Sequence, residues 1–151
     1  MANGSAAKAI VIAGLTCGVL DITAALLVYG YLGLKPLPLL QGIAGGVLGP
    51  RAFDGGLTTA LLGLILHFVI AFGAATVFCL ASRGLRFLVK HAVLSGVLYG
   101  VVVYFFMNEF VVPLSAASKH PFSLKMMVIG AVIHIFCVGL PISLIVRRYG
   151  K

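Results

Sequence analysis

Residues 57–80 read LTTALLGLILHFVIAFGAATVFCL, and this run decides the class of fold. The run contains no Asp, Glu, Lys or Arg, and His67 is its one histidine. A helix rises ~1.5 Å per residue, so about 20 apolar residues cross a hydrocarbon core of ~30 Å. The run therefore predicts a transmembrane helix.

Three further runs have the same character, at about residues 9–34, 92–114 and 126–146. Hydrophobic residues make up 62% of the 151 and charged residues only 9%, whereas soluble domains are about a quarter charged. A water-soluble fold is therefore excluded. We predict an all-α, integral membrane bundle of four transmembrane helices, which forms a single domain over residues 1–151 and is surrounded by the lipid bilayer.

The basic residues indicate how the chain is oriented. The formal charge is +8, but the eleven Lys and Arg residues stand at the ends of the apolar runs, so we do not expect a nucleic-acid partner. Alternating the spans places Lys8, Arg83, Arg86, Lys90, Arg147, Arg148 and Lys151 on one side, and Lys35, Arg51, Lys119 and Lys125 on the other. Because Lys and Arg are enriched in cytoplasmic loops, both termini are predicted to be cytoplasmic.

The connector between the first two spans is itself apolar. Residues 38–49 read PLLQGIAGGVLG, with Pro36 and Pro38 near the start and Gly49 and Pro50 at the end. These positions fit the rules for helix starts and stops. We expect a re-entrant or interfacial half-helix, and the alternative is an apolar loop packed on the bundle.

Two polar residues stand just before spans. Asp54 precedes the second span and Ser123 precedes the fourth. Both side chains are common helix N-caps, because an oxygen can accept from a free backbone N–H of the first turn. We expect both to act as caps.

Three ionisable residues, Asp21, His67 and His134, lie about halfway along three different spans. Such groups are costly in the membrane and usually face the bundle interior or a water-filled cavity. They are therefore expected to share one depth and to form one cluster.

Three interpretations of this cluster compete. In the first, Asp21 accepts hydrogen bonds from one or both histidines and only fixes the packing. In the second, the cluster binds or relays a proton or an ion, since histidine titrates near neutral pH. In the third, His67 and His134 ligate haem iron or a metal ion.

A second polar set is expected to line an outer vestibule. It consists of Gln41, Arg51, Asp54, Asn108 and Glu109. An Arg51–Glu109 ion pair could form there, although a pair at the interface contributes little stability. Gln41 is expected to face the cavity that the half-helix lines.

Other motifs indicate packing rather than catalysis. Glycines recur at four-residue spacing at positions 14 and 18, 42 and 46, 45 and 49, and 96 and 100, which permits close helix contact inside the bundle or between copies. Cys17, Cys79 and Cys137 lie inside apolar runs and are expected to be small core residues. No nucleotide-binding, metalloprotease or nucleophile-elbow motif is present in the sequence, so we predict that the protein is not an enzyme.

Three runs, GVLDITAA (18–25), LQGIAGGVLG (40–49) and GLILHFVIAF (63–72), resemble those of small bacterial inner-membrane proteins of uncharacterised activity. The resemblance implies the four-helix architecture and a bacterial inner membrane, but no activity. We therefore expect a protein that binds or passes a small ion, proton or solute through the midplane cluster without a cofactor, as a homo-oligomer or with a membrane-protein partner. The alternatives are a haem- or metal-binding electron-transfer subunit and a structural accessory subunit.

Overall fold

The computed structural model describes residues 2–117 and 123–150, and it is helical without strands over that part of the chain. The helices long and apolar enough to cross a membrane are Gly4–Tyr31, Gly56–Gly84, Ala92–Leu114 and Leu124–Tyr149. The predicted all-α class and the four predicted spans are confirmed, with ends that differ by a few residues. The protein is a multi-pass membrane protein.

The first span is α1 (Ala2–Tyr31) and the second is α3 (Gly56–Gly84). Between them lie α2 (Pro36–Leu48) and the 3-10 helix η1 (Gly49–Asp54). The third span consists of α5 (Ala92–Phe106), the π-helical segment η2 (Met107–Val111) and α6 (Val112–Leu114). The fourth consists of α7 (Leu124–Ile133), the π-helical segment η3 (His134–Gly139) and α8 (Leu140–Tyr149), and the short α4 (Phe87–Lys90) joins the second span to the third.

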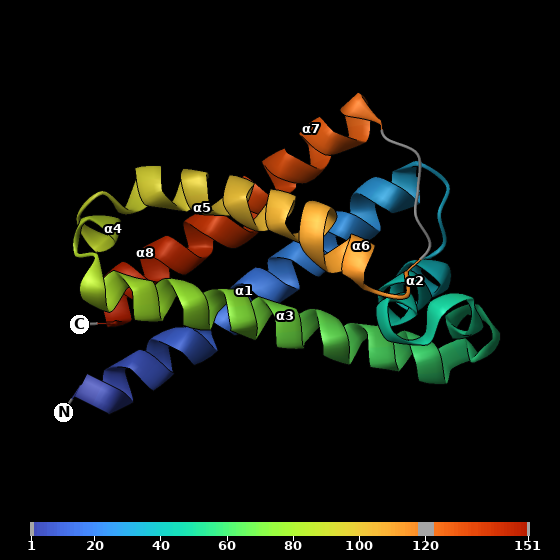
Figure 1. Ribbon diagram of the computed structural model, residues 1–151, viewed down its shortest axis with the longest axis horizontal. Coiled ribbons are helices and arrows are strands. Elements are labelled where there is room, and N and C mark those ends of the chain that lie inside the picture. The colour runs from blue at the N-terminus through green and yellow to red at the C-terminus, as the bar shows by residue number, and fades with distance from the viewer. Residues whose placement is uncertain (1, 118–122, 151) are drawn as a thin grey trace.

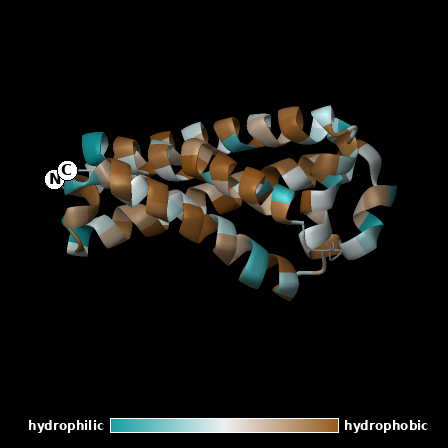
Figure 2. Cartoon of the chain, turned by 90° about the horizontal axis from the view of Figure 1, so that it is seen from above, coloured by the Kyte–Doolittle hydropathy of each residue, from teal (hydrophilic) through white to brown (hydrophobic). Residues whose placement is uncertain are grey.

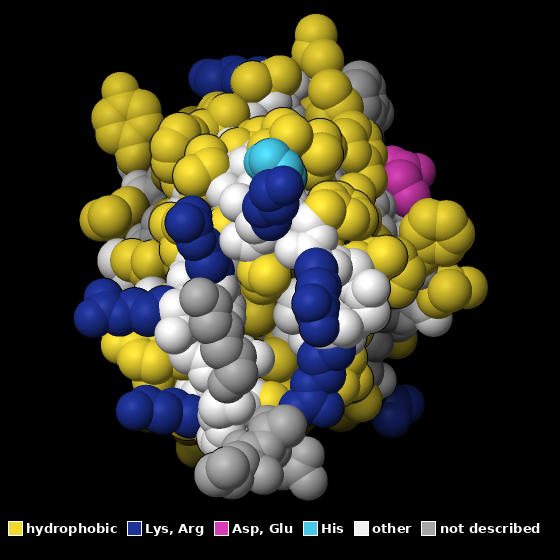
Figure 3. All heavy atoms as spheres, turned by 90° about the vertical axis from the view of Figure 1, so that its left-hand side faces the viewer, with side chains coloured by type: hydrophobic (Ala, Val, Ile, Leu, Met, Phe, Trp, Pro, Cys, Tyr) yellow, Lys and Arg dark blue, Asp and Glu magenta, His cyan; other side chains and the backbone are white. Residues whose placement is uncertain are grey.

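Both termini lie at one end of the molecule, here called the terminal end, and α2 lies at the other, the α2 end (Figure 1). Hydrophobic residues cover most of the length between the two ends (Figure 2). Lys and Arg side chains gather on the terminal end (Figure 3), as the alternation of the spans predicts. Lys119 and Lys151 lie outside the described residues, and the cytoplasmic location of the termini stays a prediction.

Small side chains bring the first, second and fourth spans together. Ala9, Ala13 and Cys17 are buried at intervals of four residues, so they form one face of α1. This face packs in one cluster with Phe78 of α3 and Ile142 of α8. Small residues on one face let helix backbones approach closely in a membrane, where lipid removes the hydrophobic drive between helices.

Two of the three cysteines are the small core residues that the sequence predicts. Cys17 and Cys79 are buried and Cys137 is partly buried, and all three are free thiols. Cys17 and Cys79 belong to the core cluster of the bundle, and Cys137 does not.

The glycine pairs predicted to mediate packing do so within the bundle at two places. On α1, a Cβ at Gly18 would lie 2.6 Å from the ring of Phe68, so the glycine makes room for an aromatic side chain of α3. On α5, a Cβ at Gly100 would lie 2.6 Å from the carbonyl oxygen of His134 and the Cα of Ile135. The α5–η3 crossing is therefore a contact between backbones.

Each π-helical segment precedes a proline by two residues. Pro113 follows η2 and Pro141 follows η3. A proline lacks the N–H that would bond to the carbonyl four residues earlier, and its ring crowds that carbonyl. Just before each proline the helix is wider, because a backbone N–H bonds to the carbonyl five residues earlier. The N–H of Val112 bonds to the Met107 oxygen, and the N–H of Leu140 bonds to the Ile135 oxygen. Such widenings change which side chains face the bundle interior.

The apolar connector forms a helix, so the alternative of a loop is wrong. α2 has 13 residues, with prolines in its first turn, and it is about 20 Å long at ~1.5 Å per residue. It packs on α3, where a Cβ at Gly63 would collide with the carbonyl group of Leu40. Whether α2 enters the membrane as a re-entrant helix stays a prediction.

The two expected helix caps have different outcomes. The Ser123 hydroxyl accepts from the Met126 N–H at 3.4 Å, so the predicted cap of the fourth span is confirmed. The predicted Asp54 cap is wrong, because Gly55 is the N-cap residue of α3 and makes no side-chain capping bond. Residues 49–54 form a 3-10 helix, so Asp54 lies inside η1 rather than at the cap position.

A candidate ligand-binding cavity

A cavity of about 740 Å³ lies between the spans and reaches α2. Its walls come from α1, α2, η1, α3, the third span with residues 115 and 117, and η3. Most lining side chains are aliphatic, such as Ile43, Ile70, Val103 and Val138. This size is typical of pockets that hold small organic molecules.

All three residues of the predicted midplane cluster line this cavity. Asp21 comes from α1, His67 from α3 and His134 from the first position of η3. Each side chain is partly buried. The structure therefore brings the three residues to one space, as their shared depth predicts.

Each histidine bonds to a backbone carbonyl instead of to Asp21. The Nε2 of His67 lies 2.9 Å from the Gly18 oxygen, and the Nδ1 of His134 lies 2.9 Å from the Gly130 oxygen. A carbonyl only accepts, so these ring nitrogens must carry the hydrogen. Within the described residues, neither imidazole is hydrogen-bonded to Asp21, which corrects the first interpretation of the cluster.

The two histidines therefore retain one acceptor each when they are neutral. In His67 it is Nδ1, and in His134 it is Nε2. The His134 ring also packs edge-on against Tyr104, with centroids 5.4 Å apart. The protein holds both rings in place, and within the described residues the opposite ring nitrogens make no hydrogen bond.

Gln41 does not line the cavity, contrary to expectation. The side chain is 3% exposed, and its amide nitrogen lies 3.1 Å from the Gly56 oxygen and 3.3 Å from Thr59 Oγ1. The Thr59 hydroxyl in turn donates to the Ala52 oxygen at 2.6 Å. Gln41 joins α2 to η1 and to the start of α3, so it is a structural link.

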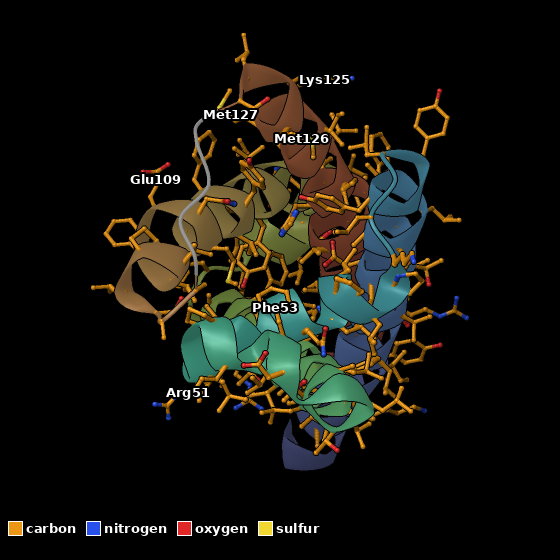
Figure 4. All side chains as sticks on the ribbon, turned by 90° about the vertical axis from the view of Figure 1, so that its right-hand side faces the viewer. Arg51, Phe53, Glu109, Lys125, Met126 and Met127 are labelled. Carbon is orange, nitrogen blue, oxygen red and sulfur yellow. The ribbon has the colours of Figure 1, made fainter. Side chains whose placement is uncertain are left out.

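The rest of the expected vestibule is dispersed. Only Asn108 lines the cavity, and its amide donates to the Tyr104 oxygen at 2.9 Å. Arg51 and Glu109 are exposed and lie well apart in the view of the α2 end, with Glu109 at the upper left and Arg51 at the lower left (Figure 4). Asp54 is exposed on η1. Among the described residues, Arg51 and Glu109 do not form the ion pair considered from the sequence.

The geometry gives no support to a metal ion held by several side chains. Within residues 2–117 and 123–150, no three or more His, Cys, Asp or Glu side chains come together as a metal site. The cavity does hold two imidazoles, which are the ligands that haem iron with two axial histidines would use.

The sequence predicts that the half-helix lines a cavity, but it did not single out the residues of α2 that do so. Gly42, Gly45, Gly46 and Gly49 line the cavity, and a Cβ at Gly42 or Gly45 would meet nothing within 4 Å. Gly42 and Gly45 therefore widen the space instead of making a close contact, whereas Gly46 and Gly49 lie near Ser115 and Ala116. The sequence feature that could have indicated this cavity wall is the repetition of glycine on a helix too short to cross the membrane.

Aromatic and polar residues at the α2 end were also missed. Tyr29, Phe53 and Ser115 line the cavity. Phe53 is 50% exposed and lies centrally in the view of that end (Figure 4). The N–H of Ala116 donates to the Gly46 oxygen at 3.0 Å, so the end of the third span is tied to α2. Phe53 and Ser115 come from connecting segments, whose positions depend on tertiary contacts, whereas Tyr29 lies near the end of α1.

The comparisons with known proteins add no further constraint. No family model, no curated protein and no solved structure matches this chain.

Proposed function

We propose that this membrane protein binds a small solute or ion in the cavity and passes it, or a proton, along the spans. Asp21, His67 and His134 are the groups that would bind it. The observation that carries the proposal is that these three side chains, from three different spans, line one cavity of about 740 Å³. We further propose that the protein acts as a homo-oligomer in a bacterial inner membrane with both termini cytoplasmic.

Physical chemistry supports a role for the cluster beyond packing. A charged or titratable group inside a membrane is costly unless a partner satisfies it. Asp21 is partly buried, and within the described residues its carboxylate makes no hydrogen bond to another side chain or to the backbone. A transported cation or proton would be such a partner.

The test compares proton entry into proteoliposomes that contain an internal pH dye. After an imposed acid jump, with K⁺ and valinomycin to balance charge, the parent should acidify its vesicles faster than protein-free vesicles. Asp21→Asn should lower this rate at least tenfold, because an amide cannot carry the proton. His67→Gln and His134→Gln should reduce it less, since each replaces only one of the acceptors.

Glu109→Gln is the matched control. Glu109 is a second carboxylate on a spanning segment, but it is exposed and lies outside the cavity. Replacing this carboxylate by an amide should leave the rate of proton entry within a factor of two of the parent rate. Two results would refute a role of the cluster in proton transport. One is no proton flux in the parent, and the other is the same proton flux in all four variants as in the parent at equal reconstituted amounts.

The haem- or metal-binding alternative rests on the two imidazoles in the cavity. It predicts that protein purified from cells grown with iron and a haem precursor has a Soret band. His67→Gln and His134→Gln should each then shift or remove the band. A colourless parent without stoichiometric metal would exclude this alternative and leave solute or ion binding.

A further inference from the structure

We propose that the ligand of this cavity is a monovalent organic cation with apolar substituents. The inference rests on the proposed function, because it names the chemical class that the same cavity would bind. It follows from the charge of the lining, from its hydrogen-bonding groups and from its apolar walls.

The charge of the lining is opposite to that of the whole chain. The protein has eleven Lys and Arg residues and a formal charge of +8. Among the described lining residues, however, there is no Lys or Arg, and Asp21 is the single carboxylate. With neutral histidines the cavity therefore has a net negative charge. An anion would meet an unpaired carboxylate there, whereas a cation would neutralise it.

The hydrogen-bonding groups of the lining favour a cation as well. Most side-chain donors already bond to backbone carbonyls: Cys17 to Gly14, His67 to Gly18, Asn108 to Tyr104, Ser115 to Val112 and His134 to Gly130. The Asp21 carboxylate and the second nitrogen of each imidazole are left as acceptors. Fewer donors are left, namely the Tyr29 hydroxyl and the second amide hydrogen of Asn108. A ligand that is positively charged fits this balance, and one that is anionic does not.

The walls distinguish an organic cation from a metal ion. Hard cations require several oxygen ligands, often from more than one carboxylate, and among the described residues no group of three or more His, Cys, Asp or Glu side chains that could hold a metal ion is present. Ile43, Ile70 and Val138 instead present apolar surface, and Phe53 and Tyr29 present aromatic rings. Apolar substituents would gain contact with these walls, and the positive charge would also be attracted to aromatic faces.

The experiment uses two ions that have the same shape and opposite charge. Binding of tetraphenylphosphonium and of tetraphenylborate to the detergent-solubilised, full-length protein is measured by equilibrium dialysis, with protein-free micelles subtracted. Both ions have an apolar outer surface, so a difference in their binding reports the effect of the sign of the charge. We expect saturable binding of the phosphonium at about one per cavity, with an affinity at least tenfold higher than that of the borate.

Variants then locate the binding. Asp21→Asn should weaken phosphonium binding about tenfold or more and reduce the preference over borate, while Asp21→Glu should retain part of both. Glu109→Gln should bind both ions as the parent does. Gel filtration shows which variants remain folded, and the two-ion comparison on the parent tests the proposal even when a variant does not fold.

Each failure has a distinct meaning. Equal binding of both ions, or undiminished phosphonium binding by folded Asp21→Asn, would overturn the cation proposal but not solute binding in the cavity. Proton flux without phosphonium binding would overturn it while the proposed function stands. Selective, Asp21-dependent phosphonium binding without proton flux would support the cation site and refute proton transport.

Discussion

Gly139→Leu should prevent stable assembly of the bundle. A Cβ at Gly139 would collide with the Gly96 carbonyl oxygen and lie 2.8 Å from the Cα of Gly100. These neighbours are backbone atoms, so no change of rotamer relieves the collision. Overpacking usually costs about 1–3 kcal/mol. A clash that separates two spans should exceed that, and we expect a loss of about 4 kcal/mol or more.

Gly73→Leu is the control for this substitution. Gly73 is an exposed glycine within a span, and a Cβ there would meet nothing within 4 Å. Both variants add the same side chain to a spanning helix. Thermal aggregation followed by gel filtration should show Gly139→Leu aggregated or absent, and Gly73→Leu close to the parent. A monodisperse Gly139→Leu protein with the melting temperature of the parent would contradict the backbone contact between α5 and η3.

Gly63→Leu should detach α2 from α3 and leave the contacts among the four spans in place. A Cβ at Gly63 would overlap the Leu40 carbonyl and lie 3.2 Å from the Ala44 nitrogen. Both atoms belong to the backbone of α2, so the whole helix must move. We expect a loss of about 3 kcal/mol in this local contact. Ligand binding should fall as well, because α2 forms a wall of the cavity.

A single engineered cysteine measures this displacement. Leu39 lines the cavity and is partly buried, so Leu39→Cys in a protein whose native cysteines are replaced should react slowly with a polar maleimide. Adding Gly63→Leu should raise the rate about tenfold, and adding Gly73→Leu on the same helix should not. An unchanged rate with Gly63→Leu would show that α2 is not held by this contact.

Sequence by itself determined the features that depend on local order along the chain. Apolar length specifies a span, because about 20 helical residues are needed to cross the bilayer. The same counting predicts a common depth for Asp21, His67 and His134, since position along a helix converts directly into distance, and the three residues do line one cavity. The Ser123 cap is equally local, with its partner Met126 three residues away.

Tertiary structure decided which atoms these residues meet. His67 bonds to Gly18 of another span and Gln41 bonds to Gly56 and Thr59, and no spacing within one helix specifies such partners. Glu109 shares a π-helical segment with Asn108, yet only Asn108 lines the cavity. The rotation of each helix about its axis follows from close backbone crossings. Examples are the contact of Gly100 in α5 with η3 and the contact of Gly63 in α3 with α2. Because these crossings join residues distant in the chain, the cavity forms only when the helices have packed.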